Sequence, residues 1–255
     1  MVARLRAAGC VFAEDEAALL LVDASGPDEL ERMVQARVDG LPLEQVLGWA
    51  ELLGVRVAVS RDVFVPRRRS ELLAREALAA ARRVGGRPVV LDLCCGSGAV
   101  GVAVTALHGD VELHAAEIDP GSAACARENV VPRGGSVHEG DLYDALPASL
   151  RGRVDVMVVN APYVPTAELG FLPAEAREHE PRVALDGGED GVEIQRRVAS
   201  GAPGWLAPGG VLLVETSERQ VPLTAAAFES AGLRVRVTAD DELAATVVLG
   251  SSGAS

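Results

Sequence analysis

The sequence contains no lysine, because all 24 of its basic residues are arginine. Without a lysine amine the chain cannot form a Schiff base with a carbonyl substrate or with pyridoxal phosphate. It also cannot supply the lysine that reaches the phosphates in a P-loop nucleotide site. This absence excludes two large classes of enzyme before any motif is considered.

Metal-binding patterns and long apolar runs are missing as well. The chain has four cysteines, Cys10, Cys94, Cys95 and Cys125. They include no C-x-x-C pair and no cysteine–histidine spacing typical of a zinc site. No 18 uncharged apolar residues run together, and acidic residues at 14–16 interrupt the first apolar stretch. We therefore expect a reduced cytoplasmic protein without bound metal, signal peptide or membrane span.

The charge balance is acidic. With 37 acidic residues the formal net charge is −13, which disfavours binding to the phosphate backbone of nucleic acids. Hydrophobic residues make up 49% of the chain, enough for a sizeable core. The four histidines are His108, His114, His138 and His179. No nucleophile elbow accompanies them, so we expect them to be structural or solvated.

The residue pattern in the first third of the chain predicts helices followed by strands. From Glu14 to Val38 apolar residues recur at helical spacing, with a break at 25–28, which predicts a small helical domain. In residues 52–65 apolar and polar residues then alternate on both sides of a turn at 60–62. This pattern predicts a β-hairpin that links two domains. A helix rich in alanine and leucine is predicted from Ser70 to Val84.

Beyond Pro88, short apolar runs alternate with helical patterns. The runs predicted as strands are Val89–Leu93, Val111–Ala116, Val154–Val159, Val211–Val214 and Val247–Leu249. Continuous apolar strands separated by helices favour a mostly parallel sheet with helices on both faces. Residues 250–255 are predicted to be disordered.

The first of these strands leads into a turn of small residues. It runs from Asp92 to Gly98 as Asp-Leu-Cys-Cys-Gly-Ser-Gly, and its glycines let the backbone approach a ligand. Gly96, Gly98 and Gly101 formally match the spacing of a dinucleotide site, but the carboxylate of Asp92 would repel a pyrophosphate. The turn favours a neutral or cationic ligand, with a tight turn made for packing alone as the alternative.

Acidic side chains follow the next two strands. Glu117 ends the second strand one βαβ unit later, where a carboxylate can accept hydrogen bonds from both hydroxyls of a ribose. Asp141 follows the short run 136–138 and could bond an adenine amino group, while Leu142 packs on the ring. Solvated acids at strand ends are the alternative.

An amide, a proline and an aromatic ring end another strand, in the run Asn160-Ala161-Pro162-Tyr163. The neutral oxygen of the Asn160 amide, beside a backbone carbonyl, can accept both hydrogens of a planar NH2 group. This arrangement leaves the nitrogen lone pair free for attack, and the ring of Tyr163 can stack on the same plane. A β-turn made of Asn and Pro is the alternative.

Taken together, these motifs resemble those of the class I S-adenosylmethionine-dependent methyltransferases that modify amino nitrogens. The closer resemblance is to the HemK/PrmC-type protein-(glutamine-N5) methyltransferases. It extends over nearly the whole chain, through Pro42–Gly48, Phe64–Glu71 and Ala184–Gly191. It implies an α/β, Rossmann-like fold with a seven-stranded, mostly parallel sheet whose last strands form an antiparallel edge. The implied domains are residues 1–51 for substrate recognition, a linking hairpin at 52–66 and the methyltransferase domain at 67–255.

The resemblance also implies a reaction and its residues. The reaction is methylation of a glutamine side chain in a peptide-chain release factor, or in another protein with an exposed glutamine, with S-adenosylmethionine as cofactor. Asn160 is then the catalytic amide, and Asn160, Ala161, Pro162 and Tyr163 bind the substrate. The implied cofactor-binding residues are Asp92, Cys94, Gly96, Ser97, Gly98, Glu117, Ile118, Asp141, Leu142 and Asn160.

Three departures from the family pattern keep other functions open. Ala161 stands where proline is usual, Cys94-Cys95 replaces the commoner Gly-Thr, and the N-terminal region is short. The short region favours a small-molecule N-methyltransferase of secondary metabolism as one alternative. An adenine-N6 methyltransferase of nucleic acid shares the amide-Pro-aromatic motif, but the acidic charge weighs against it. A cofactor-binding adaptor without turnover is the last alternative, and the presence of Asn160 and Tyr163 argues against it.

Overall fold

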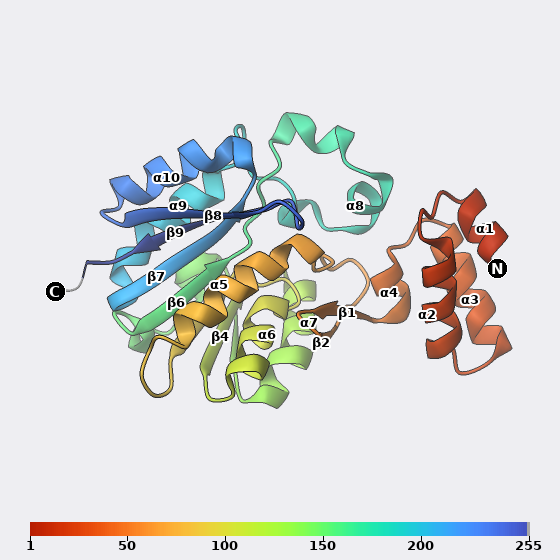
Figure 1. Ribbon diagram of the computed structural model, residues 1–255, viewed down its shortest axis with the longest axis horizontal. Coiled ribbons are helices and arrows are strands. Elements are labelled where there is room, and N and C mark those ends of the chain that lie inside the picture. Colours follow the sequence, from red (N-terminus) through yellow and green to blue (C-terminus); the bar gives the residue numbers. More distant parts are fainter. Residues whose placement is uncertain (254–255) are drawn as a thin grey trace.

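Three helices at the N-terminus pack around a small core of their own, at one end of the molecule (Figure 1). They are α1 (Val2–Ala7), α2 (Ala13–Asp23) and α3 (Pro27–Val38), and the short helix α4 (Leu43–Leu47) follows. The structure is a computed structural model that describes residues 1–253. The helical pattern predicted between Glu14 and Val38 is confirmed as α2 and α3, while α1 and α4 lie outside it.

A β-hairpin follows, but not with the predicted turn. Its strands β1 (Trp49–Leu52) and β2 (Val55–Ala58) pair so that Leu52 lies opposite Val55. The turn is therefore Leu53-Gly54, both with positive φ as in a two-residue hairpin loop, and the predicted turn at 60–62 is wrong. Residues 63–65 form no strand. The alternation that suggested one comes from the burial of Val59, Val63 and Val65 in the core.

The central sheet has seven strands in the described chain, in the order β5-β4-β3-β6-β7-β9-β8. The strands are β3 (Val89–Leu93), β4 (Glu112–Glu117), β5 (Ser136–Glu139), β6 (Val154–Val159), β7 (Leu206–Thr216), β8 (Arg234–Asp240) and β9 (Ala245–Ser251). Strands β3 to β7 are parallel, whereas β9 pairs antiparallel with both β7 and β8. The predicted mostly parallel sheet and its antiparallel edge are confirmed.

The prediction that residues 250–255 are disordered is wrong for the first two of them. Gly250 and Ser251, which fall in the predicted disordered tail, pair with β7 and β8 at the end of strand β9. Residues 254–255, also in that tail, lie outside the described residues. Strand β8 escaped prediction because arginine and threonine interrupt its apolar residues, as suits the exposed edge of a sheet.

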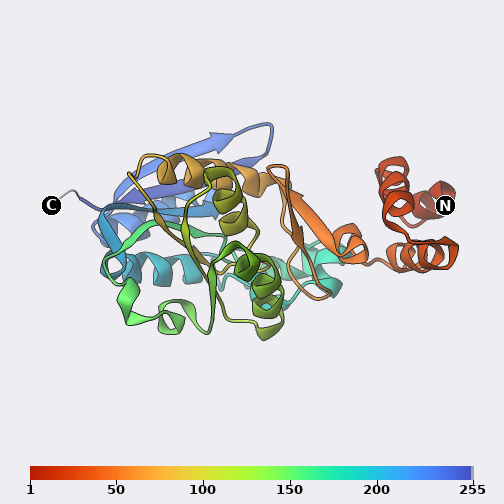
Figure 2. The same cartoon turned by 90° about the horizontal axis from the view of Figure 1, so that it is seen from below.

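Helices cover both faces of this sheet (Figures 1 and 2). These helices are α5 (Glu71–Ala81), α6 (Ala99–His108), α7 (Pro120–Val130), α9 (Glu193–Gly201) and α10 (Val221–Ser230), whereas the short helix α8 (Ala174–His179) lies outside these layers. Short 3-10 turns complete the chain at Arg68–Ser70, Val131–Arg133, Leu142–Ala145, Ala148–Leu150, Thr166–Phe171, Arg182–Ala184, Ala202–Gly204 and Glu218–Gln220. Side chains of α5 and α6 share one core with Val90 and Val156, and those of α9 and α10 share a second core with Leu91 and Met157.

These two cores explain the continuous apolar strands. Because neighbouring strand residues point to opposite faces, a strand covered on both faces needs an apolar residue at nearly every position.

Within residues 1–253 no helix is long and apolar enough to cross a membrane.

Candidate active site

A cleft of about 540 Å³ opens where the parallel strands end. The residues after β3, β4, β5 and β6 all reach it, because the carboxyl ends of parallel strands meet at one edge of a sheet. The predicted residues that line it are Asp92, Cys94, Gly96, Ser97, Glu117, Ile118, Asp141, Leu142, Asn160, Ala161, Pro162 and Tyr163. Gly98 does not line the cleft. It packs against α7 instead, where a β-carbon would lie 2.9 Å from Cγ2 of Val130.

The turn after β3 presents bare backbone to the cleft. Gly96 has a φ of +55°, and nothing lies within 4 Å of the place a β-carbon would take. Cys94 has a φ of +58°, in the left-handed region that a residue with a side chain adopts only at a cost. The backbone of the turn is therefore open to a ligand at Gly96.

The carboxylate of Glu117 is fixed beside this turn. Its Oε2 accepts a hydrogen bond from the N–H of Gly96 at 2.8 Å, and its Oε1 accepts from the N–H groups of Ile118 and Asp119. Burial raises the pKa of Glu117, and these backbone donors act in the opposite direction. The side chain therefore has one orientation, with its remaining acceptor capacity toward the cleft.

Asp92 is a nearly buried acid, 3% exposed. Its Oδ2 accepts a hydrogen bond from the N–H of Gly101, at the start of α6, at 2.8 Å. A β-carbon at Gly101 would lie 3.1 Å from the same oxygen, which explains the glycine there. Burial raises the pKa of Asp92 to about 7.

Asn160 and Tyr163 stand at the other end of the cleft. The Nδ2 of Asn160 donates to the hydroxyl of Ser70 at 3.3 Å, and its Oδ1 accepts no hydrogen bond from the rest of the described chain. The guanidinium of Arg69 lies 5.4 Å from the centre of the Tyr163 ring. Burial raises the pKa of Tyr163 to about 12, so the phenol stays neutral. Ser70 therefore orients the amide with its oxygen free.

Residues outside the sequence prediction neutralise most of the charge in the cleft. Four ion pairs involve its lining residues: Arg67–Glu180, Arg69–Glu215, Arg197–Asp141 and Arg37–Glu175. Arg67 and Arg69 are thus held by buried carboxylates. Glu215 directly follows the apolar run Val211–Val214 of β7, one residue before the strand ends, and this position is the signal by which it could have been found.

Three lining acids have no basic partner. Asp92, Glu117 and Asp119 have no ion pair with a basic residue anywhere in residues 1–253. All three lie at the end of the cleft formed after β3 and β4, which we call the cofactor end. The end lined by residues 64–70, 160–164 and 172–185, which we call the acceptor end, has its charges paired. The cofactor end therefore attracts a cation.

The two adjacent thiols of the turn are held in the neutral form. Burial, and after it the nearby carboxylates of Glu117 and Asp92, raise the pKa of Cys94 and of Cys95 above the usual range of a thiol. All four cysteines are free. Neutral thiols are poor nucleophiles, so these residues can line a site for an electrophilic ligand without attacking it.

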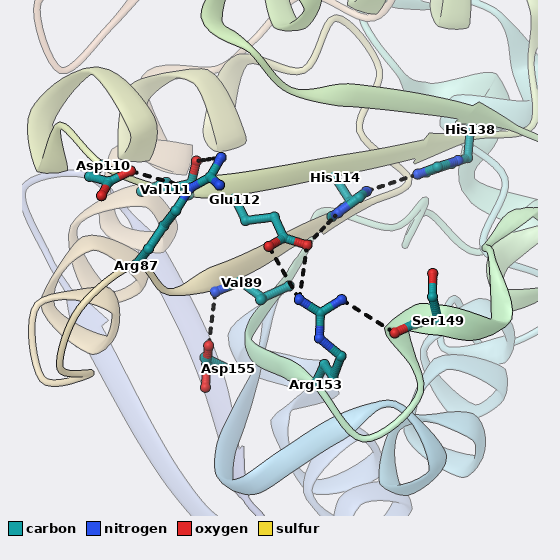
Figure 3. Close-up of polar contacts among 10 residues, drawn as sticks. All are labelled: Arg87, Val89, Asp110, Val111, Glu112, His114, His138, Ser149, Arg153 and Asp155. Carbon is teal, nitrogen blue, oxygen red and sulfur yellow. Dashed lines mark hydrogen bonds and ion pairs between the residues drawn. The ribbon is translucent and has the colours of Figure 1, made fainter.

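His108, His114 and His138 lie away from the cleft, and His179 belongs to the segment 172–185 without lining the cleft itself. Figure 3 shows His114 and His138 in contact, with the carboxylate of Glu112 between His114 and Arg153. Burial lowers the pKa of His138, and the stacked ring of His114 acts in the same direction. No histidine lines the cleft, and no cluster in the part of the chain described here could hold a metal ion.

Comparison with known proteins identifies the family. Residues 69–172 match the methyltransferase small domain. The release factor glutamine methyltransferase of Geobacter sulfurreducens is 37% identical over 220 residues, covering 84% of this chain and 75% of its own. The chain belongs to the release factor glutamine methyltransferase family. The enzyme of this name from Deinococcus radiodurans is 36% identical, over 84% of this chain and 77% of its own. The predicted HemK/PrmC-type family is therefore confirmed, and with it a methyltransferase.

Two further similarities bear on fold and substrate. A 4-amino-L-phenylalanine/4-methylamino-L-phenylalanine methyltransferase from Streptomyces pristinaespiralis is 34% identical over 81% of this chain and 71% of its own. The crystal structure of a methyltransferase from Pyrococcus furiosus superposes with a TM-score of 0.58 at 15% identity, over 79% of this chain and 91% of that one. The second similarity confirms the predicted class I methyltransferase fold.

Proposed function

We propose that this enzyme transfers a methyl group from S-adenosylmethionine to the side-chain amide nitrogen of a glutamine in a peptide-chain release factor. One observation carries the proposal. The free amide oxygen of Asn160 and the backbone of Ala161 lie at an acceptor end whose charges are paired, next to a cofactor end with uncompensated acids. The first feature suits a neutral NH2 group and the second a cation.

The cofactor end fits S-adenosylmethionine, which supplies the methyl group on a positively charged sulfonium. The open backbone at Gly96, with Ser97 beside it in the lining, leaves room for the amino-acid part of the molecule. Glu117 would accept from the ribose hydroxyls, while Asp141 and Leu142 would contact the adenine. Asp92, Cys94 and Ile118 complete the lining. The acids favour the sulfonium electrostatically, and the neutral thiols do not compete with the acceptor for the methyl group.

Asn160 and Ala161 would hold the acceptor. A carboxamide nitrogen is a poor nucleophile, because its lone pair is delocalised into the carbonyl. The Oδ1 of Asn160 and the carbonyl oxygen of Ala161 would accept hydrogen bonds from the two N–H groups of the acceptor amide. They would also stabilise the positive charge that grows on its nitrogen. As the nitrogen–carbon bond forms the carbon–sulfur bond breaks, and the nitrogen then releases one proton to water. One such preorganised contact contributes roughly 3–4 kcal/mol to lowering the barrier.

A free amino acid is the second candidate acceptor, since one relative acts on 4-amino-L-phenylalanine. Its carboxylate would need an available cation. Arg67 and Arg69 at the acceptor end are instead paired with Glu180 and Glu215, which are almost fully buried. The pairing favours an acceptor side chain without its own charge, as glutamine in a protein has.

Mass spectrometry of a release factor incubated with the enzyme and isotopically labelled cofactor tests the acceptor. 4-Amino-L-phenylalanine, free glutamine and an adenine-containing oligonucleotide are the parallel acceptors. We expect the label on one glutamine of the release factor. Labelling of 4-amino-L-phenylalanine with none on the release factor would establish the second candidate in its place.

Asn160→Ala tests the site. Turnover should fall by roughly 10²–10³, by analogy with the loss of one oxyanion-hole donor, while cofactor affinity stays within about twofold. Asn129→Ala is the matched control, because the chain's other asparagine only ties backbone groups together, donating to the carbonyls of Ala58 and Ser97. We expect it to lower Tm and leave turnover per folded molecule nearly unchanged. If folded Asn160→Ala keeps more than a third of the wild-type rate, Asn160 is not the catalytic amide.

A further inference from the structure

The acceptor end of the cleft has a wall built from short turns. This wall, residues 172–185, comprises α8 and the 3-10 turn Arg182–Ala184, and residues near both of its ends line the cleft. An isolated bridge between Val164 and Asp186 joins its base to the rest of the chain. Because the wall lies outside the sheet, contacts with other elements hold it in place, and one of them is the ion pair of its Glu180 with Arg67.

Two side chains of the N-terminal helices do so. Arg37 of α3 forms an ion pair and a hydrogen bond with Glu175 of α8, 138 residues away in the sequence. Gln45 of α4 donates through Nε2 to the carbonyl oxygen of His179, at the end of α8, at 3.1 Å. Figures 1 and 2 show the wall next to α4 in both views.

Arg37 is suited to fix the position of α8. Its side chain is 10% exposed, and its Nε lies 2.7 Å from the Oε2 of Glu16 in α2. Its Nη1 donates to the carbonyl oxygen of Leu41 at 3.1 Å. A buried guanidinium is unfavourable without its partners, so a displacement of α8 away from the N-terminal helices is opposed. The ion pair therefore ties the wall to the N-terminal helices.

We propose that Arg37 and Gln45 are positioning residues for the methyl acceptor. Neither lines the cleft formed by the described residues, so they act through the wall, which they keep in the place where the acceptor binds. The N-terminal helices then set the affinity for the acceptor and leave the cofactor end unchanged. The inference rests on the proposed function in one respect, that the acceptor binds between Asn160 and this wall.

Steady-state kinetics with the release factor provide the first test. Arg37→Gln should raise the KM for the acceptor by about tenfold, with kcat and the Kd for cofactor within about twofold. The matched control is Arg4→Gln, because Arg4 also pairs with a glutamate of the same helices, Glu31, but at the surface. It should change none of these values. Glu175→Gln removes the same contact from its more exposed side, and remains informative if Arg37→Gln does not fold.

A double-mutant cycle separates positioning from direct contact. If Arg37 acts through Glu175, the double variant should have nearly the KM of either single variant, because both remove one interaction. Gln45→Leu should raise the KM independently. Additive effects of Arg37→Gln and Glu175→Gln would mean that Arg37 does not work through the wall, and would overturn the proposal.

Hydrogen exchange provides a test without an acceptor. The amides of residues 176–187 should exchange about tenfold faster in Arg37→Gln than in wild type, while those of β3 stay protected. If wild type does not methylate the release factor, the proposed function fails, and exchange still decides whether Arg37 holds the wall. Exchange and acceptor KM in Arg37→Gln that match those of Arg4→Gln would overturn the inference.

Discussion

The affinity of the enzyme for S-adenosylmethionine should depend on pH through Asp92. Burial raises the pKa of this acid to about 7 in the free protein, so it changes charge near neutral pH. A cationic ligand at the cofactor end favours the ionised form, and binding should therefore release a proton from Asp92. Affinity should rise as pH rises through this range.

The size of the effect follows from the pKa. At pH 6 roughly a tenth of Asp92 is ionised and at pH 8 roughly nine tenths, so binding that requires the ionised form strengthens about tenfold over this interval. The stability of the ligand-free protein depends on pH in the opposite direction to the cofactor affinity. Because the folded-state pKa exceeds the unfolded value, Asp92 lowers the free energy of unfolding of the ligand-free protein as pH rises from about 4 to about 7.

Titration calorimetry at pH 6, 7 and 8, in buffers with different enthalpies of ionisation, measures both the Kd and the number of protons released. Asp92→Asn is the matched control, since an amide oxygen can still accept from the N–H of Gly101. This variant should bind more weakly with a pH-independent Kd, and should melt higher than wild type at pH 8. A Kd that is flat with pH in wild type, or a slope that persists in Asp92→Asn, would refute the reasoning. In the second case the titrating group is another one, and Glu117, whose charge acts on Asp92, is the candidate.

Three substitutions test the remaining parts of the cofactor and acceptor ends. Glu117→Ala should weaken cofactor binding roughly 10- to 100-fold in calorimetry, the loss expected for hydrogen bonds to a charged group, and a change within about twofold would contradict its assignment to the ribose. Ala161→Pro should keep activity and a Tm within roughly 3 °C of wild type, because the N–H of Ala161 donates no backbone bond in the described chain and its carbonyl is retained. A large fall in Tm would show that this N–H is needed. Cys94→Gly should raise Tm by roughly 2–4 °C, through relief of the left-handed backbone, with cofactor Kd within about twofold. A lower Tm would mean that the packing of the thiol outweighs the strain.

Much of the sheet and the cleft could be predicted from sequence for one physical reason. A parallel strand covered on both faces is apolar almost throughout, so the first polar residue after it marks the edge of the sheet. Asn160 directly follows such a strand, β6, and Glu117 is the last residue of β4 after the buried pair Ala115-Ala116. The topology brings the ends of these two strands together at one cleft.

The contacts that act across long sequence separations could not be predicted in this way. Arg37 and Glu175 lie in helices with ordinary surface composition, and only the folded chain brings them together. The turn of the hairpin was predicted at the wrong place because buried residues outside a sheet can alternate as a strand does, as Val63 and Val65 do here. Local patterns record which side chains are buried, but not what they are buried against.

The two edges of the central sheet differ from its interior in a way that affects how copies of the enzyme behave at high concentration. An edge strand offers unpaired N–H and C=O groups to any other extended chain. Strand β5 limits this exposure with only four residues, and β8 carries Arg234 and Arg236 along the other edge. Arg236 is paired with Glu76, so within the described chain Arg234 is the uncompensated arginine on this edge, and a charged side chain on an edge strand opposes the growth of the sheet from one molecule into the next. The same residues that hide β8 from a search for apolar runs thus protect the folded protein against aggregation through its edge.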